Sequence, residues 1–266
     1  MSAPVSISPP ATAPVPSLGR AFLGVCRLTV PRFFTPTHLL ALVGALVLVG
    51  FIAYAMLGSN GGAHDYVGWL VQVYFTFLVP VVAFLTGGGV IRDEMKPGTV
   101  DYVLTRPVPR PAFVGFKYVA HVLGTQIQFL LALGVLFAVG TWRHAEGLTA
   151  ALPLLLLAQV LVVFAFTAFG FLCGAIVGRF VVIGVIYGAI VEIGVGHIPT
   201  QINRLSMTQQ VKSMLQPVIP TAEAANIASA ASPLLTTAAL LGFALVTLAA
   251  AATLFHLREL SRANES

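Results

Sequence analysis

Long apolar stretches separated by short polar segments dominate this chain. A helix needs about 20 predominantly apolar residues to cross the hydrocarbon core of a bilayer, and several stretches reach that length. Glycines 87–89 are predicted to interrupt the second stretch late. Within a membrane domain of residues 35–257, the pattern predicts an all-α polytopic membrane protein with six transmembrane helices, at about Thr37–Leu57, Val67–Ile91, Phe113–Trp142, Ala151–Gly178, Phe180–Ile198 and Leu234–Leu257.

The composition excludes a water-soluble globular protein. Of 266 residues, 58% are hydrophobic and only 9% are charged, whereas soluble domains carry about 25% charged residues. The net charge of +5 is not gathered in a basic run with interleaved aromatic residues, so no nucleic-acid partner is expected. Membrane lipid is the expected surrounding of this chain.

The distribution of Lys and Arg orients the predicted helices. Of these 14 side chains, only Arg143, Arg204 and Lys212 fall in loops on one side of the membrane. The others fall in the N-terminal region, in loops on the opposite side, or after the last helix. Because cytoplasmic loops are enriched in Lys and Arg, both termini are predicted to be cytoplasmic. We expect a multi-pass protein of the bacterial plasma (inner) membrane.

The segments outside the predicted spans differ in character. Residues 1–16 are rich in Ser, Pro and Ala, carry no positive charge, and are predicted to be a disordered tail that is retained. Residues 17–34 predict an amphipathic helix in the membrane interface, with Arg20 and Arg27 on one stripe and a proline at its end. An ordinary lead-in to the first span is the alternative. Residues 258–266 are predicted to form a cytoplasmic tail.

Motifs for nucleotide hydrolysis, metal binding and covalent catalysis are missing from the sequence. A P-loop requires Gly directly before its Lys, but the lysines follow Met95, Phe116 and Val211. The histidines lack metal-ligand spacing. Cys26 and Cys173 are far apart in apolar surroundings, which favours buried thiols over a disulfide or metal site. The chain is therefore predicted to be no enzyme and to bind no metal or cofactor, and a nucleotide-driven cycle would need a second polypeptide.

Two polar segments interrupt the predicted membrane domain. Residues 92–111, on the cytoplasmic side, contain a Pro-Gly turn, a threonine suited to cap a short helix, and Arg106-Pro107 to end that helix. A solvated loop is the alternative for this segment. Residues 199–233, on the external side, include an amphipathic stretch at 201–215.

The cytoplasmic segment resembles the signature of the type-2 (ABC-2) ABC transporter permeases. In that signature an acidic residue precedes Gly-Thr, an apolar pair, Arg-Pro-x-x-Arg and Gly-x-Lys, matched here by Glu94, Gly98-Thr99, Val103-Leu104, Arg106-Pro107, Arg110 and Gly115-x-Lys117. A second match is formed by Glu192, Gly196-His-Ile-Pro199 and Leu205-Ser206-Met207. The resemblance covers most of residues 17–257, and the prolines at 109 and 111 depart from the pattern.

The resemblance implies a permease that works with a separate ABC ATPase. Residues 94–106 would form a coupling helix that docks into a cleft of this partner, which holds ATP and Mg. The helix at 17–34, with Arg20 and Arg27, would match the interface helix beside the ATPase. A second permease, identical or similar, would complete the complex. The residues assigned to ATPase coupling are Arg92, Asp93, Glu94, Lys96, Gly98, Thr99, Asp101, Tyr102, Arg106, Pro107 and Arg110; their mixed charges suit partner choice and register.

Inside the predicted spans, polar residues and glycines carry the remaining hypotheses. Glu192 is the only acid there, which makes it a candidate for a translocation pathway, with Gln159 and Gln128 at comparable depth. A role in helix packing is the alternative for all three. The glycines that repeat every fourth residue allow close helix approach, either between spans four and five or at a homodimer seam, and they are Gly170, Gly174, Gly178, Gly184 and Gly188.

The function that these observations favour is the membrane subunit of an ATP-driven exporter. Closure of the ATPases would move the coupling helices and alternate access between the two sides of the membrane. The alternative is a structural or regulatory anchor of an envelope machine, which transmits ATPase motion without carrying a substrate. An intramembrane enzyme centred on Glu192 has little support. The sequence does not identify a substrate.

Overall fold

The computed structural model describes residues 17–58, 62–94, 110–176, 179–198, 201–219 and 232–263. Within these ranges every regular element is a helix and no strand occurs, so the predicted all-α class is confirmed for them. The predicted tail at 1–16 and most of the predicted coupling segment, residues 95–109, lie outside the described residues.

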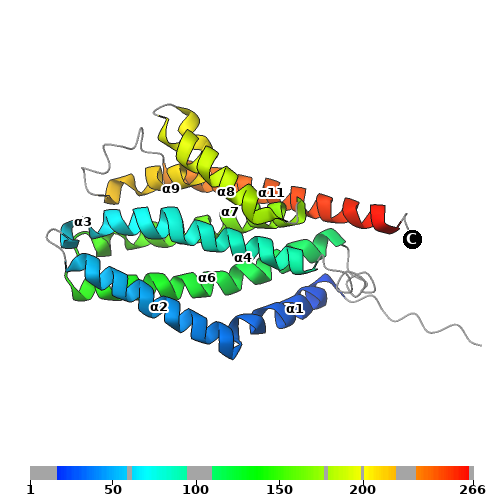
Figure 1. The fold of residues 1–266 in the computed structure, drawn as a ribbon, viewed down its shortest axis with the longest axis horizontal. Coiled ribbons are helices and arrows are strands. Elements are labelled where there is room, and N and C mark those ends of the chain that lie inside the picture. The colour runs from blue at the N-terminus through cyan, green and yellow to red at the C-terminus, as the bar shows by residue number, and fades with distance from the viewer. Residues whose placement is uncertain are drawn as a thin grey trace, which may run out of the picture.

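Five helices of the described chain are long and apolar enough to cross a membrane. They lie side by side in an elongated bundle, and the start of α1 and the end of α11 lie at the same end of it (Figure 1). One crossing consists of α3 (Gly62–Trp69), the π-helical η2 (Leu70–Leu78) and α4 (Val79–Glu94) in succession. The other four are α2 (Pro36–Leu57), α6 (Arg110–Trp142), α7 (Leu148–Ile176) and α11 (Pro233–Ala263).

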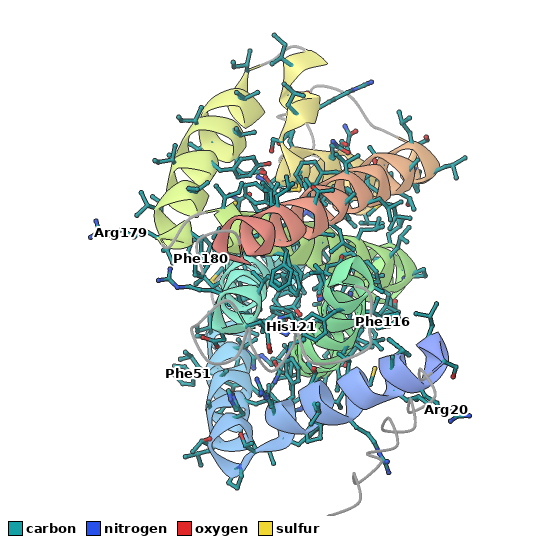
Figure 2. The ribbon with its side chains drawn as sticks, turned by 90° about the vertical axis from the view of Figure 1, so that its right-hand side faces the viewer. Arg20, Phe51, Phe116, His121, Arg179 and Phe180 are labelled. Atoms are coloured by element: carbon teal, nitrogen blue, oxygen red, sulfur yellow. The ribbon has the colours of Figure 1, made fainter. Side chains whose placement is uncertain are left out.

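Burial separates a central helix from a peripheral one. In the most apolar part of α7, 72% of the residues are buried, whereas the corresponding share for α2 is 6%. Helix α7 packs against α4, α6 and α11, while Phe51 of α2 points away from the bundle (Figure 2). Because lipid is as apolar as leucine, the exposed face of α2 suits acyl chains or another membrane helix.

The predicted fifth span, Phe180–Ile198, is shorter than the other crossings. Helix α8 (Phe180–Tyr187) continues as the π-helical η3 (Gly188–Gly194), and the chain then tightens into the 3-10 turn η4 (Val195–His197). The apolar helix Phe180–Gly194 rises about 22 Å, less than the roughly 30 Å of a hydrocarbon core. Six full-length spans are therefore not confirmed.

The predicted interruption of the second span by glycines 87–89 is wrong. Helix α4 runs unbroken through them to Glu94. The glycines serve a close approach to α7: a Cβ on Gly87 would lie 2.7 Å from the carbonyl oxygen of Thr167, and one on Gly174 would lie 2.5 Å from that of Gly88. Small residues that let two membrane helices touch through their backbones stabilise the pair by packing, which offsets the poor helix propensity of glycine.

The N-terminal helix lies against the bundle at a steep angle to α2. Helix α1 (Leu18–Thr29) has one apolar and one polar side, and Pro31 lies in the 3-10 segment η1 (Val30–Phe34) that follows it. Ser17 stands at the N-cap position, but its side chain makes no capping hydrogen bond. Figure 2 shows α1 crossing the end of the bundle with Arg20 pointing outward.

Two further segments extend or divide what the sequence pattern predicts. The amphipathic stretch at 201–215 is divided into η5 (Gln201–Leu205) and α9 (Met207–Leu215), with η6 (Gln216–Val218) after it. Helix α11 continues to Ala263, past the predicted end of the last span at Leu257. No helix breaker occurs between these two positions, so nothing in the sequence ends the helix at the membrane boundary.

Candidate functional site: a buried ion pair between α4 and α6

A buried ion pair joins the two helices that flank the predicted coupling segment. Lys117 in the second turn of α6 donates to Oε1 of Glu94, the last residue of α4, at 2.6 Å. The two side chains are only 7% and 9% exposed. Isolated charges in such surroundings are strongly disfavoured, whereas a close pair compensates them. The chain between these two residues therefore begins and ends at one fixed point.

The surroundings of the ion pair make its position rigid. Tyr118, next to Lys117, donates its hydroxyl to the carbonyl oxygen of Phe164 in α7 at 2.8 Å. The Tyr118 ring also meets Phe171 edge to face, with centroids 5.4 Å apart. Helix α6 is thus tied to α4 by charge and to α7 by a hydrogen bond and aromatic packing, one residue apart.

One turn further along α6, His121 lies in the centre of this end of the bundle (Figure 2). It is 2% exposed, with the ring of Phe33 from η1 at 5.3 Å and that of Phe171 from α7 at 6.2 Å. Phe33 also covers Gly124, where a Cβ would lie 2.5 Å from its ring. The segment after α1 is therefore packed directly on the helix that carries Lys117.

Helix α1 itself packs on the same part of α6 through its apolar side. Val25 is buried against Phe113 and Ala120, and Phe22 meets Phe116 edge to face at 5.4 Å. Cys26 borders this contact, and burial raises the pKa of its thiol. Arg20 and Arg27 stay exposed on the opposite side of α1.

The sequence-predicted coupling residues fall into three groups in the structure. Arg92 and Asp93 are exposed in the last turn of α4, whereas Glu94 is buried in the ion pair. Arg110 begins α6, and its side chain is outside the described part. The remaining assigned residues lie outside the described residues and are Lys96, Gly98, Thr99, Asp101, Tyr102, Arg106 and Pro107.

Glu192 accepts hydrogen bonds from the start of α9 at the other end of the molecule. The hydroxyls of Ser206 and Thr208 donate to its Oε2 at 2.6 and 2.5 Å. The backbone N–H of Thr208 donates to the same oxygen at 3.1 Å, and that of Met207 donates to Oε1 at 3.2 Å. Ser206 in turn caps α9 by accepting from the N–H of Gln209 at 3.1 Å. A carboxylate at a helix N-terminus accepts from backbone N–H groups that have no partner within the helix, and its negative charge interacts favourably with the helix dipole.

The three candidate pathway residues have different surroundings in the structure. Gln159 is fully buried, and neither polar atom of its side chain has a hydrogen-bond partner among the described residues. Gln128 is only partly buried. Gln126, which the sequence reasoning did not single out, is the buried glutamine of α6, and it donates to the carbonyl oxygen of Val160 at 3.0 Å. Within the described residues, no hydrogen bond links Glu192 to either candidate glutamine.

Three of the repeating glycines in α7 and α8 face α4. Gly170 and Gly174 oppose the backbone of α4, and a Cβ on Gly184 would collide with the ring of Phe84 in α4. Gly188 has nothing within 4 Å of a Cβ position, and Gly178 lies outside the described residues. Helix α4, rather than a direct contact between α7 and α8, is thus what these glycines bring close.

Two properties set what this arrangement is able to do. Among the described residues, no group of three His, Cys, Asp or Glu side chains is arranged to hold a metal ion. The ion pair, the Tyr118 hydrogen bond and the aromatic contacts around them connect α4, α6, α7 and η1.

A family model described as ABC-2 family transporter protein matches residues 27–260. No curated protein matches the chain.

Proposed function

This chain belongs to the ABC-2 family of transporter proteins, and from that premise we propose that it is the permease subunit of an ATP-driven exporter. As a member of this family with five long apolar helices, it is an integral multi-pass membrane protein. In the proposal, ATP and Mg are bound by a separate ABC ATPase, two permeases pair, and both termini face the cytoplasm of a bacterial cell.

The observation that carries the proposal is the buried ion pair between Glu94 and Lys117. A force applied to residues 95–109 by a moving partner is delivered where α4 and α6 are locked together at 2.6 Å. Because packed interiors transmit strain rather than absorb it, such a push shifts α4 and α6 together and, through Tyr118, α7. Without this ion pair, a solvated loop would move independently of α4 and α6 and would not pass the same motion on to them.

The exposed charges beside the Glu94–Lys117 ion pair are suited to a protein partner. Arg92 and Asp93 are exposed at the end of α4, next to the segment that resembles a coupling helix. Arg20 and Arg27 are exposed on α1, at the same end of the bundle. We propose that the ATPase contacts both surfaces, with mixed charges fixing its register, and that the arginines of α1 also reach lipid phosphates.

At the far end, the segment from α8 to α9 is proposed to close the pathway. The chain rises through α8 and η3 and turns back, and α9 is then buried through Met207, Val211 and Met214. Irregular backbone at membrane depth is tolerated where protein covers it, and Glu192 supplies acceptors to the turn. Together with five full crossings this segment gives an even number of passages, which agrees with both termini facing the cytoplasm.

The decisive experiment is purification of the tagged chain from its native membrane, followed by identification of bound proteins and measurement of Mg-ATP hydrolysis. We expect an accompanying chain with a P-loop, and faster ATP hydrolysis when the permease is present. Glu94→Lys or Lys117→Glu is expected to abolish this stimulation, and the double exchange to restore a large part of it. Glu146→Gln is the matched control, because Glu146 is 70% exposed and pairs with His64 at the opposite end.

Three outcomes would contradict parts of the proposal. Complexes without any nucleotide-binding chain would remove the transporter assignment of this subunit. A bound ATPase whose activity is the same with Glu94→Lys, Lys117→Glu and unaltered permease would show that the ion pair does not couple the two proteins. Retention of ATPase stimulation without movement of any compound in reconstituted vesicles would favour a mechanical anchor.

A further inference from the structure

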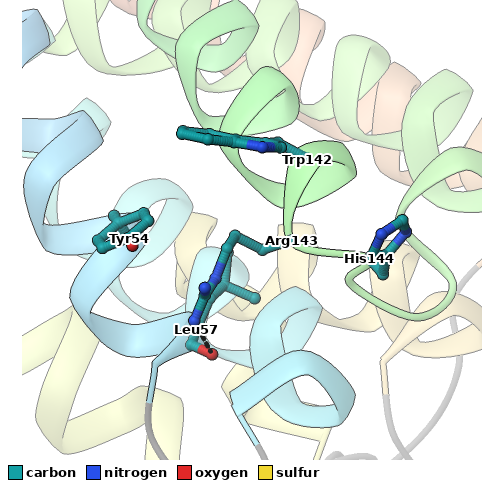
Figure 3. A pocket seen from close by; sticks show the side chains of 5 residues that line it. All are labelled: Tyr54, Leu57, Trp142, Arg143 and His144. Carbon is teal, nitrogen blue, oxygen red and sulfur yellow. Dashed lines mark hydrogen bonds between the residues drawn. The ribbon is translucent and has the colours of Figure 1, made fainter.

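We infer that a pocket at the end of the bundle opposite Glu94 binds a phosphate anion, carried either by an anionic lipid headgroup or by a free phosphate compound. The pocket has a volume of about 250 Å³ and is lined by Tyr54, Leu57, Trp142, Arg143 and His144 (Figure 3). These residues come from the last turn of α2, from the last residue of α6 and from the turn that follows α6. The inference requires only that the bundle spans a membrane, so it is independent of ATPase coupling.

The guanidinium of Arg143 is the chemical centre of the pocket. Its Nη2 donates a long hydrogen bond of 3.4 Å to the carbonyl oxygen of Leu57, and its central carbon lies 4.9 Å from the centroid of the Tyr54 ring. Figure 3 shows the side chain extended from the turn toward these two residues. Both contacts fix the plane of the guanidinium before any ligand arrives, which lowers the entropic cost of binding.

Most of the donor capacity of Arg143 remains for a ligand. A guanidinium carries five N–H donors and is always charged, and the bond to Leu57 uses one of them. In the described part of the chain no carboxylate lies within ion-pair distance of it. Glu146, three residues further along, is paired with His64 at 3.1 Å instead. Among the described residues, the arginine is therefore a positive charge without a counter-ion.

A phosphate is the ligand that this group recognises best. The planar fork of arginine matches two phosphate oxygens with two parallel hydrogen bonds. The pocket volume of about 250 Å³ is below the roughly 300–1,000 Å³ of pockets for drug-sized molecules, so it suits a small polar group. Backbone at positive φ in His144 (58°) and Gly147 (72°) makes the tight turn that presents Arg143 to this space.

The neighbouring aromatic rings place the pocket at the level of lipid headgroups. Trp142 is 73% exposed and Tyr54 is 45% exposed, with their ring centroids 6.1 Å apart. Exposed Trp and Tyr side chains gather where membrane and water meet. Phosphate groups of the surrounding lipids therefore lie at the height of Arg143.

The test uses Trp142 as a local reporter. Replacing the other of the two tryptophans, Trp69→Phe, leaves Trp142 as the single tryptophan, which is excited selectively at wavelengths that tyrosine does not absorb. The full chain in detergent is titrated with dibrominated phosphatidylglycerol or with dibrominated phosphatidylcholine, which quench nearby tryptophan. We expect the apparent affinity for phosphatidylglycerol to be about fivefold higher, the effect of one charge at an anionic surface. Arg143→Gln should remove that preference, and Arg143→Lys, which keeps charge but loses the fork, should retain part of it.

Controls separate the two sources of phosphate and test the inference. Arg204→Gln changes another arginine of the same predicted side and should leave the preference intact. If inorganic phosphate removes it while sodium chloride of equal ionic strength does not, the ligand is a free phosphate compound, and if neither removes it the ligand is the lipid. Equal quenching by both lipids and no effect of inorganic phosphate, or a full preference retained in Arg143→Gln, would overturn the inference.

Discussion

At the scale of single residues, the repeating glycines of α7 and η3 offer the most direct test of the packing. A Cβ on Gly174 would lie 2.5 Å from the carbonyl oxygen of Gly88, whereas one on Gly188 would meet nothing within 4 Å. Because backbone cannot give way as a flexible side chain does, Gly174→Ala should cost about 1–3 kcal/mol. Gly188→Ala should leave stability unchanged or raise it slightly. Thermal unfolding in detergent measures both, and equal stability of the two variants would contradict the observed α4–α7 contact.

The ion pair allows a second test at this scale. Lys117→Met leaves Glu94 buried without its partner and should destabilise the fold by about 3–5 kcal/mol. The double variant with Glu94→Leu has no unpaired charge and should be more stable than either single one. Unfolding of the four proteins forms a double-mutant cycle. Simple additivity of the two single effects would show that the charges do not interact.

At this scale the sequence identified functional candidates by their motifs, but it did not identify their contacts. Glu94 and Lys117 were recognised through the motif, but their contact was not, because nothing in the sequence states which side chains meet across two helices. The glutamines show the same limit. Gln128 and Gln126 lie at similar depth, but two residues rotate a helix by about 200°, so one is partly exposed while the other donates to Val160.

At the scale of elements, α9 depends on a carboxylate from another segment. Glu192→Gln removes the negative charge at the helix start and turns one acceptor oxygen into a donor, so it should loosen residues 207–215. Ser206→Ala removes the cap and should cost about 1 kcal/mol. Hydrogen exchange of α9 is expected to accelerate in both variants. Glu146→Gln serves as the surface control, and unchanged protection of α9 in Glu192→Gln would show that the carboxylate does not hold it.

The attachment of α1 is a second property of an element. Val25 is 5% exposed against α6, whereas Leu23 on the same helix is 63% exposed. Val25→Ser should therefore detach α1 and raise the mobility of a spin label placed at Leu18, while Leu23→Ser should not. Equal mobility in the two variants would contradict the packing of α1 on Phe113 and Ala120.

The positions of helices were predictable where the length and composition of an apolar run determine them. They were not predictable where a tertiary contact determines whether a helix continues or ends. The spans around α2, α6 and α7 follow from long apolar runs, and the structure begins each of them one to three residues earlier than predicted. The glycines of α4 looked like an interruption because glycine weakens an isolated helix. Their partner in α7 reverses that expectation. The early turn after η3 was missed for a related reason, since Glu192 and the start of α9 meet only in the folded chain.

At the scale of the whole molecule, the two ends of the bundle have different chemistry. One end carries α1, the ion pair and the exposed charges of α4, and the other carries α9, Glu192 and the pocket around Arg143. The sequence indicated this division through the uneven distribution of Lys and Arg. It did not indicate that the helix of the predicted fifth span is short, because apolar composition continues through Gly194 and beyond.

The direction of that short crossing decides whether the molecule traverses the membrane an even number of times. Arg179 stands before α8 and Arg204 after the turn at its far end, and both side chains are exposed. In a background with Cys26→Ser and Cys173→Ala, we expect Arg179→Cys to react with a membrane-impermeant maleimide in inside-out vesicles and Arg204→Cys in right-side-out vesicles. The physical reason is that about 22 Å of helix and the turn to η5 together carry the chain across the membrane. Helix α9, which comes after this turn, is covered by protein on its buried face and therefore does not need to cross back. Labelling of both cysteines from the same side would instead make the segment a re-entrant loop with an odd number of crossings, and the two termini would then face opposite sides.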